Sequence, residues 1–274
     1  MNALSDTVKL NNGIEIPRIG LGVYQAGSGE GTQNAVQWAL AAGYRHIDTA
    51  HIYRNEVDVG VGIRNSDIPR EALFVTTKLW NDDHGYDRAM RAFDTSLDAL
   101  GLEWVDLYLI HWPVQKKRKE SWRALSTILD SGRARSIGVS NFMVSHLEEL
   151  AEASDVVPAI NQIELHPFLQ QREVVQYCRT HGIVVEAYSP LTKGRYLDDR
   201  ELVSIAGEVG CTPAQVLIAW SLQHDFVTLP KSSSKTRIEQ NFVAREMTLT
   251  ETQMQRLDTL DRGLRTAWDP TTVP

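Results

Sequence analysis

The sequence predicts an α/β fold in which eight parallel strands, each followed by a helix, close into a single (β/α)₈ TIM barrel with an N-terminal β-hairpin. Its 274 residues suit one such barrel, which typically needs about 250 residues. Short apolar runs alternate with longer segments of helical periodicity along the whole chain. No linker, low-complexity tract or change of composition divides it. We therefore expect one domain over residues 1–274.

The expected elements follow in regular order. Val8-Lys9-Leu10 and Ile14-Glu15-Ile16 flank Asn11-Asn12-Gly13, a pattern typical of a hairpin. The eight predicted strands are Ile19–Tyr24, Tyr44–Asp48, Leu73–Lys78, Val105–His111, Ser136–Ser140, Ala159–Gln162, Ile183–Tyr188 and Phe226–Leu229. The helices expected between them include Thr32–Ala42, Tyr86–Leu100, Trp122–Ser131, Ser145–Ala153, Arg172–His181 and Pro213–Gln223. Capping signals support several of these boundaries, among them Thr212 before Pro213 and Gly101, Gly132 and Gly182 after helical runs.

Composition excludes several classes of protein. The net charge of −7 argues against a nucleic-acid partner, since binding to phosphate backbones rests on clustered Lys and Arg. The amino terminus lacks the basic flank and the apolar region of a signal peptide, so we expect none, and no apolar run is long enough for a membrane span. Cys178 and Cys211 are too far apart in sequence for a local zinc or disulfide motif, which favours a reducing cytoplasm. His46 and His51 flank Asp48 without an evident third ligand, so we expect no metal site.

A dinucleotide-binding Rossmann fold is the competing topology. Gly27-Ser28-Gly29-Glu30-Gly31-Thr32 follows the first predicted strand, and Asp48 closes the next one. The third glycine of the fingerprint would fall at Thr32, and Gly27 stands several residues beyond the strand rather than in its tight turn. A glycine-rich loop of a barrel explains the segment better.

Polar residues close the predicted strands from the second onward. In a parallel barrel all strand ends meet at one face, where the loops build the active site. A single polar residue after a strand carries little information, because loops are polar; the whole series is more specific. The series consists of Asp48, Lys78, His111, Ser140 with Asn141, Gln162, Tyr188 and Lys231.

Four residues in the first half of the barrel point to one chemistry. Lys78, at the end of an apolar strand, needs a carboxylate, and Asp48 is nearest by strand order. We expect the resulting ammonium to lower the pKa of Tyr53, making it a general acid for a carbonyl that is becoming an alkoxide. His111 can orient the same oxygen. This set favours carbonyl reduction with a hydride from a cofactor, because no nucleophile–base pair and no glycosidase pair of carboxylates is present.

The sequence resembles the aldo-keto reductases. Gly43 to Ala50, followed by Tyr53, Glu56 and Gly60, is similar to the first signature of that family. Val105 to Pro113, Ser136 to Phe142 and Leu229 to Ser232 match its patterns at strands four, five and eight, in the right order. The resemblance implies a catalytic tetrad of Asp48, Tyr53, Lys78 and His111, with Tyr53 as the proton donor.

The resemblance also implies an NADPH site. Ser140, Asn141 and Gln162 would hold the nicotinamide carboxamide, and Tyr188 would stack on the ring. Ser189, Leu191 and Lys193 would line the pyrophosphate, and Lys231, Ser232 and Arg237 would bind the 2′-phosphate. Two cations beside a helix start suit a phosphate, so NADPH is expected over NADH. Gln240, where many relatives carry Glu, and Asn241 would lie near the adenine.

Within the family, the chain is most similar to bacterial 2,5-diketo-gluconic acid reductases and methylglyoxal reductases. We expect a monomeric reductase of small aldehydes and ketones, such as 2-oxoaldehydes and diketo acids. The substrate pocket would be formed by Tyr24, Trp80, His111, Trp112 and Trp268. The alternative is a cofactor-sensing module, which keeps the barrel and the cofactor site but whose role is to bind a partner protein. Of the other histidines, His166 is expected at the surface, and His84, His146, His181 and His224 in exposed positions.

Overall fold

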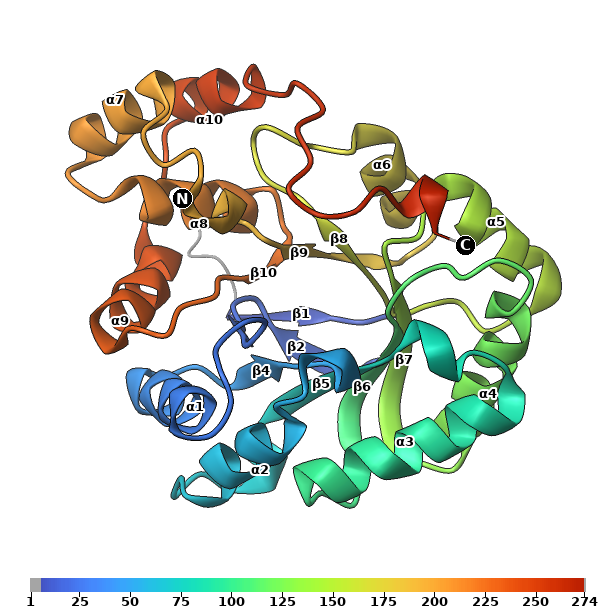
Figure 1. Cartoon of the computed structure of the whole chain (residues 1–274). Coiled ribbons are helices and arrows are strands. Elements are labelled where there is room, and N and C mark those ends of the chain that lie inside the picture. The colour runs from blue at the N-terminus through green and yellow to red at the C-terminus, as the bar shows by residue number, and fades with distance from the viewer. Residues whose placement is uncertain (1–5, 274) are drawn as a thin grey trace.

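The computed structural model describes residues 6–273 and shows a (β/α)₈ barrel after a hairpin (Figure 1). Residues 1–5, on which the expectation of no signal peptide partly rests, lie outside the described residues. Each predicted strand overlaps one observed strand. The barrel strands are β3 (Leu21–Gly22), β4 (His46–Asp48), β5 (Phe74–Leu79), β6 (Val105–Ile110), β7 (Ala134–Ser140), β8 (Ile160–Glu164), β9 (Val184–Tyr188) and β10 (Val227–Leu229).

The strands are all parallel and lie side by side in sequence order from β3 to β10. A parallel bridge between Ile19 and Thr228 joins the first and last strands and closes the barrel. A Rossmann sheet is open and reverses its strand order at the cofactor site. The Rossmann alternative is therefore wrong for this chain.

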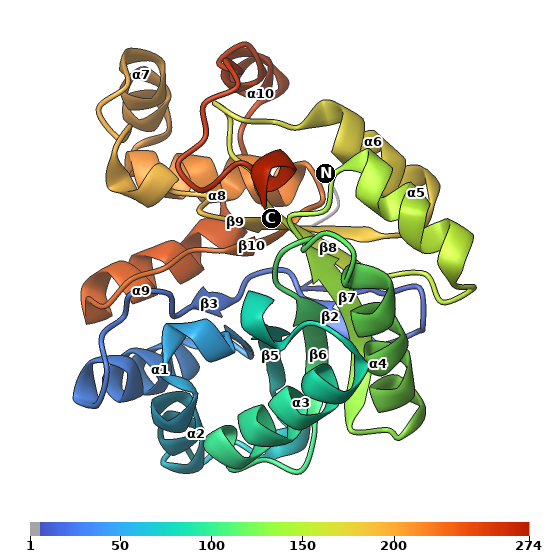
Figure 2. The same cartoon turned by 45° about the vertical axis from the view of Figure 1, so that its right-hand side comes forward.

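Helices surround the barrel on its outer side (Figure 2). Apolar residues of the helices and of the outward strand faces form the main core between the two layers. Four observed helices, α2, α7, α9 and α10, have no counterpart among those singled out from the sequence. The helices are α1 (Glu30–Ala42), α2 (Glu56–Arg64), α3 (Tyr86–Leu100), α4 (Arg118–Asp130), α5 (Val144–Ala153), α6 (Arg172–Thr180), α7 (Arg200–Val209), α8 (Pro213–Gln223), α9 (Lys235–Val243) and α10 (Glu251–Asp258).

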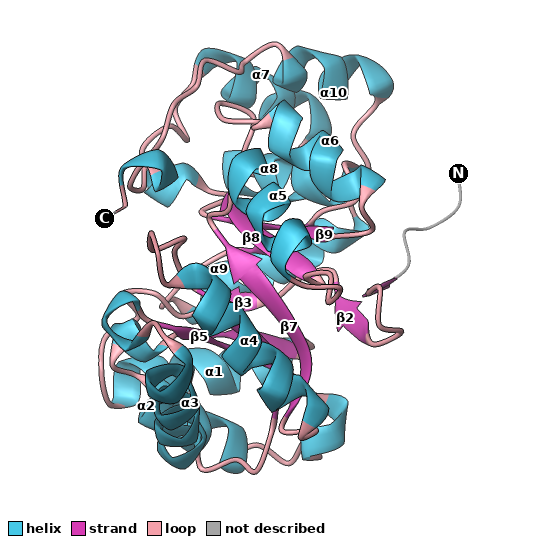
Figure 3. Ribbon diagram, turned by 90° about the vertical axis from the view of Figure 1, so that its right-hand side faces the viewer, coloured by secondary structure: helices cyan, strands magenta, loops and turns pink. Residues whose placement is uncertain are grey.

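The hairpin closes the amino-terminal end of the barrel. Strands β1 (Thr7–Lys9) and β2 (Glu15–Pro17) pair antiparallel across the predicted turn. Leu10 and Ile16 pack beneath the barrel against Phe74, Leu107 and Val227. Figure 3 shows β2 and the carboxyl terminus at opposite ends of the molecule. With one end sealed by apolar packing, the other end is left for the functional loops.

A glycine in the first family signature has a packing reason. A Cβ on Gly60 of α2 would lie 2.0 Å from the carbonyl oxygen of Leu100, at the end of α3. No side chain can occupy that distance, so α2 and α3 approach closely only because residue 60 is glycine.

Over residues 6–273, no single helix is both long and apolar enough to cross a membrane. One pair, α7 with α8, meets the length and composition test only when taken together, and it is bent by 87°.

Candidate active site

The ends of β4 and β5 bring Asp48 and Lys78 together. Lys78 Nζ donates to Asp48 Oδ1 at 2.7 Å and to the carbonyl oxygen of Thr49 at 2.7 Å. Both side chains are almost completely buried. The predicted ion pair is confirmed. The backbone carbonyl of Thr49 gives the buried ammonium a second acceptor, which helps to replace the hydrogen bonds to water that it has lost.

A short turn after β4 carries Tyr53 to the same end of the barrel. The turn is the 3₁₀ helix η1 (His51–Tyr53), followed by Arg54 in the left-handed region at φ 56°. Asn55 fixes the turn, because its side chain accepts from the Thr49 hydroxyl at 2.8 Å and donates to the Val23 carbonyl at 3.0 Å. The Tyr53 ring packs against Tyr24, with centroids 4.9 Å apart.

The prediction that Lys78 lowers the pKa of Tyr53 is wrong for this arrangement. Burial raises the pKa of Tyr53 well above its ordinary value, and the negative charge of Asp48 adds to the rise. Lys78 Nζ lies 5.1 Å from the centroid of the Tyr53 ring, but its charge is balanced by Asp48. A phenol with a raised pKa remains protonated at neutral pH, so Tyr53 is suited to donate a proton.

His111, just beyond the end of β6, faces Tyr53 across the site. The ring centroids of the two residues are 5.7 Å apart and nearly perpendicular. Burial, together with the charge of Lys78, lowers the pKa of His111 well below its ordinary value. The imidazole is therefore neutral near pH 7 and presents a single N–H donor. His84 contributes to the same lowering; it is 1% exposed, so its predicted surface position is wrong.

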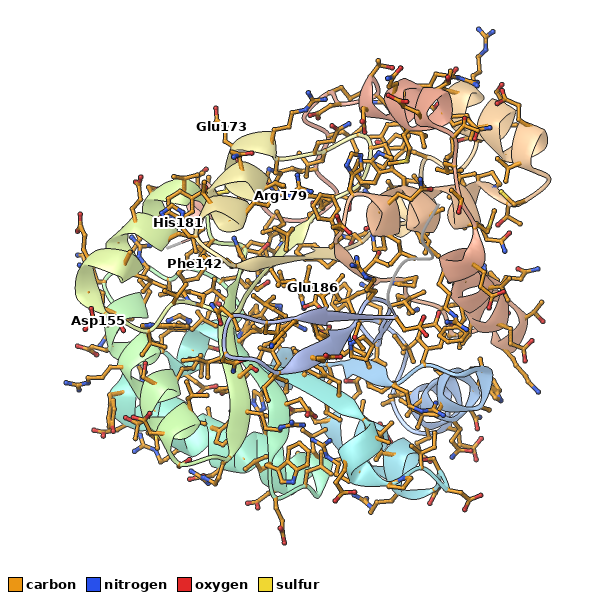
Figure 4. The ribbon with its side chains drawn as sticks, turned by 180° about the vertical axis from the view of Figure 1, so that it is seen from behind. Phe142, Asp155, Glu173, Arg179, His181 and Glu186 are labelled. Atoms are coloured by element: carbon orange, nitrogen blue, oxygen red, sulfur yellow. The ribbon has the colours of Figure 1, made fainter. Side chains whose placement is uncertain are left out.

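A second carboxylate, which the sequence did not single out, lies below this pair. Gln162 Nε2 donates to Asp48 Oδ2 and to Glu186 Oε2, both at 2.8 Å. Glu186 is fully buried near the centre of the barrel (Figure 4), and His46 Nε2 lies 3.8 Å from its Oε1. Burial and the charge of Asp48 raise the pKa of Glu186 to about 8. Because of this raised pKa, Glu186 carries a proton at neutral pH. The charge of Lys78 is balanced by Asp48, so the buried cluster of Asp48, Lys78 and Glu186 is close to neutral.

Glu186 makes the stability of the fold depend on pH. The pKa of Glu186 in the folded chain is above its ordinary value of 4.5. The contribution of its protonated side chain to the free energy of unfolding is therefore complete below about pH 4.5 and is lost as the pH rises through about 8. We expect Glu186→Gln, which mimics the protonated form, to flatten the decline in the free energy of unfolding between about pH 5 and about pH 9. Urea unfolding at several pH values measures the slope of the free energy of unfolding against pH for the wild type and for Glu186→Gln.

The matched control is Glu173→Gln, because Glu173 projects from α6 into solvent (Figure 4). This control should leave the slope of the wild type unchanged. Equal slopes for the wild type and Glu186→Gln would contradict a buried, protonated Glu186.

The residues predicted to hold the nicotinamide meet at the ends of β7, β8 and β9. Asn141 Nδ2 donates to the His111 carbonyl at 3.0 Å, and Asn141 Oδ1 accepts from the Tyr188 hydroxyl at 2.8 Å. Ser140 Oγ donates to the carbonyl of Gln162 at 2.8 Å. Both N–H groups of the Gln162 side chain are used inside the barrel, so its Oε1 is the atom left for a ligand.

The loop after β9, predicted to line a pyrophosphate, has an unusual backbone. Ser189, Thr192 and Lys193 all have positive φ, at 50°, 53° and 54°. Such conformations cost free energy outside glycine and concentrate at functional sites. Leu191 is half-buried in this loop, whereas Lys193 is exposed and donates to the carbonyl of Thr266 at 2.6 Å. The structure thus joins this loop to the carboxyl-terminal segment.

Two cations lie together at the start of α9. Burial lowers the pKa of Lys231, and so does the charge of Arg237. No ion pair involving either cation occurs within the described part of the chain. Ser234, at the helix start, makes no side-chain cap, so the first N–H groups of α9 are available to an anion. Ser232 and Asn241 are buried nearby in sequence, and Gln240 is exposed.

The predicted substrate pocket is a set of aromatic rings around His111. Trp80 packs edge-on against His111 with centroids 5.3 Å apart. Trp268, from the carboxyl-terminal segment, lies 5.5 Å from Trp112 and 6.4 Å from Trp80 between centroids. Tyr24 and Trp268 are the exposed members, at 48% and 63%. These rings form an apolar wall beside Tyr53 and His111.

Two further residues lie at this end, and their contacts were not predicted from the sequence. His166, predicted at the surface, is fully buried, and its Nε2 lies 3.2 Å from Glu164 Oε1. Glu164 is also buried and accepts hydrogen bonds from the carboxyl-terminal segment. For Glu186, the signal available in the sequence was a carboxylate inside an otherwise apolar strand; Glu164 ends a strand that also contains Asn161 and Gln162, so it gave no such signal. Within residues 6–273, no cluster of three or more His, Cys, Asp or Glu residues could hold a metal ion.

Comparison with known proteins agrees with this geometry. A family-wide sequence profile, described as the aldo/keto reductase family, matches residues 18–262. The chain belongs to this family. It is 46% identical to glyoxal reductase of Bacillus subtilis (strain 168), with 98% of the chain and 97% of the relative aligned. It is 47% identical to 9,11-endoperoxide prostaglandin H2 reductase of Trypanosoma cruzi (strain CL Brener), with 98% and 96% aligned.

Solved aldo/keto reductases share the fold. A mutant of Gox0644, crystallised in complex with NADPH, has a TM-score of 0.93, is 41% identical and aligns over 100% of both chains. The family resemblance inferred from the motifs is therefore confirmed, as is the barrel.

Proposed function

We propose that this aldo/keto reductase reduces small, uncharged aldehydes and ketones, 2-oxoaldehydes such as methylglyoxal in particular, with NADPH as the cofactor. Its class, an NADP-dependent oxidoreductase acting on carbonyl groups, follows from the family and from its NADPH-bound neighbour. The observation that carries the proposal is the convergence of Tyr53, His111 and the Asp48–Lys78 pair beside an aromatic wall.

The residues present fit NADPH. Lys231 and Arg237, which lack a carboxylate partner in the described chain, meet the uncapped start of α9 and would hold the 2′-phosphate. Ser189, Leu191 and Lys193 would line the pyrophosphate from the left-handed loop. Ser140, Asn141 and Gln162 would hold the carboxamide beside Tyr188, with Gln240 and Asn241 near the adenine. When bound, NADPH supplies the hydride.

The chain's own residues then perform the acid catalysis. His111, neutral near pH 7, donates its N–H to the substrate carbonyl oxygen and orients it toward Tyr53. The protonated Tyr53 hydroxyl gives its proton to that oxygen as negative charge develops there. Lys78 Nζ lies 5.1 Å from the centroid of the Tyr53 ring and, by pairing with Asp48, offsets the negative charge that would oppose a phenolate formed after proton transfer. Asp48 holds the ammonium in place.

The pocket supports uncharged substrates over diketo acids. None of its five side chains, Tyr24, Trp80, His111, Trp112 and Trp268, carries a positive charge at neutral pH. A carboxylate bound there would lose its hydration without a charged partner. Glyoxal reductase, the relative from Bacillus subtilis, is consistent with a small carbonyl substrate. We further propose that the enzyme acts as a monomer in the cytoplasm.

Steady-state oxidation of NADPH tests the proposal. We expect turnover with methylglyoxal, with one equivalent of alcohol formed per NADPH oxidised, and a lower kcat/KM for 2,5-diketo-gluconate and with NADH. Binding of NADPH without turnover of any carbonyl compound would instead support the alternative of a cofactor-sensing barrel. A higher kcat/KM for the diketo acid would overturn the preference for uncharged substrates.

A further inference from the structure

The position of Trp268 is not explained by its own burial. Its ring closes one side of the substrate pocket against Trp112 and Trp80, yet the side chain is 63% exposed. It belongs to the carboxyl-terminal segment after α10, drawn in red in Figure 1, which ends on the side of the molecule opposite the hairpin strand β2 (Figure 3). A mostly exposed ring on an irregular segment keeps one position only if the backbone beside it is held.

A buried carboxylate holds that backbone. Glu164 is the last residue of β8 and is 1% exposed. It accepts hydrogen bonds from the Thr266 N–H at 2.7 Å, from the Thr266 hydroxyl at 2.5 Å and from the Ala267 N–H at 3.0 Å. His166 Nε2 lies 3.2 Å from the same carboxylate. Together these hydrogen bonds outweigh burial and lower the pKa of Glu164 to about 2.

The residues held by Glu164 directly precede Trp268 in the chain. Of the remaining contacts of this segment, Arg265 donates to the Gln171 side chain at 3.1 Å, from a partly buried position. The exposed Lys193 donates to the Thr266 carbonyl. The two N–H groups held by Glu164 are thus the buried attachment closest in sequence to Trp268.

We propose that Glu164 is a positioning residue for substrate selection, which sets the aromatic wall of the pocket by holding Thr266 and Ala267 beside Trp268. The proposal rests on the proposed carbonyl reductase activity. Glu164 is buried and its carboxylate oxygens contact Thr266, Ala267 and His166, so its effect passes through Trp268. It should therefore influence the binding of substrates large enough to reach Trp268 and leave the proton transfer from Tyr53 unchanged.

Glu164→Gln tests this with a minimal change of shape. The amide keeps one acceptor oxygen but places an NH₂ group against N–H donors, so part of the attachment is lost. The matched control is Asp106→Asn. Asp106 is also a fully buried carboxylate, on β6, and it accepts from the Val75 N–H at 2.9 Å and from Arg70 at 2.8 Å. It lies toward the amino-terminal end of its strand, away from the wall.

The first measurement is amide hydrogen exchange of the segment around Thr266 and Ala267. We expect Glu164→Gln to accelerate exchange there by about tenfold or more, and Asp106→Asn to leave it unchanged. This measurement needs no turnover, so it is informative even if the proposed activity is wrong. Unchanged exchange in Glu164→Gln would overturn the positioning role.

The second measurement compares phenylglyoxal, whose ring can reach the wall, with the smaller methylglyoxal. We expect Glu164→Gln to raise KM for phenylglyoxal by about tenfold, with kcat changed less than about twofold and methylglyoxal affected less. In a Trp268→Ala background the same change should add nothing further. The proposal fails if the KM increase persists without Trp268, or if Asp106→Asn produces it as well. A wild type that reduces neither compound would count against the proposed function instead.

Discussion

Replacing Tyr53 by Phe should lower kcat by about 10²–10⁴-fold while the affinity for NADPH stays within about twofold, because only the general acid is removed. The phenyl ring retains the packing against Tyr24 and His111. The residues proposed to bind the cofactor phosphates are on other loops. Steady-state reduction of methylglyoxal measures kcat, and quenching of tryptophan fluorescence by NADPH measures affinity.

Tyr108→Phe is the matched control. Tyr108 is buried in β6, packs on Phe93, and its hydroxyl has no hydrogen-bond partner among the described residues. Removing that hydroxyl should leave kcat and stability close to the wild type. A near-normal kcat in Tyr53→Phe would rule out Tyr53 as the proton donor, whereas equal losses in both variants would indicate a general effect of hydroxyl removal.

The fold was predictable because its signal is local. An apolar run of a few residues followed by a helical period specifies a strand and its crossover, and repetition of this unit specifies the barrel. The same logic gave the candidate site, since the ends of parallel strands converge. The Asp48–Lys78 pair followed from neighbouring strands alone, and the structure confirms it.

The errors concern contacts between residues distant in sequence. Glu164 meets Thr266 across 102 positions, and Gln162 meets Asp48 across 114. His166 is an exception, because the carboxylate beside it, Glu164, is only two positions away; the sequence does not show that the fold buries both residues. The pKa of Tyr53 was misjudged for a related reason: its sign depends on burial and on whether Lys78 is already neutralised, and neither is visible in a linear motif.

The strongest effect on cofactor choice is expected from removing the two cations at the start of α9. Lys231→Ala with Arg237→Ala should weaken binding of NADPH by about 10²–10⁴-fold, since each of the two charge-assisted hydrogen bonds to a phosphate contributes about 1.5–3 kcal/mol and about 1.4 kcal/mol corresponds to tenfold. NADH lacks the 2′-phosphate, so its dissociation constant should change less than about threefold by the same reasoning. Fluorescence titration with both dinucleotides gives the two constants.

The matched control removes two cations from α4, on the other side of the barrel from α9 (Figure 1). Lys119 and Arg123 are both exposed there, so Lys119→Ala with Arg123→Ala changes the net charge equally without touching the proposed site. If the effect were long-range attraction of an anionic dinucleotide, both double variants would weaken NADPH similarly, and salt would abolish the difference from the wild type. A loss confined to the Lys231 and Arg237 variant, and to NADPH, is what direct contact with the 2′-phosphate requires. Equal losses for NADPH and NADH in that variant would place these two cations on a part of the dinucleotide that both cofactors share.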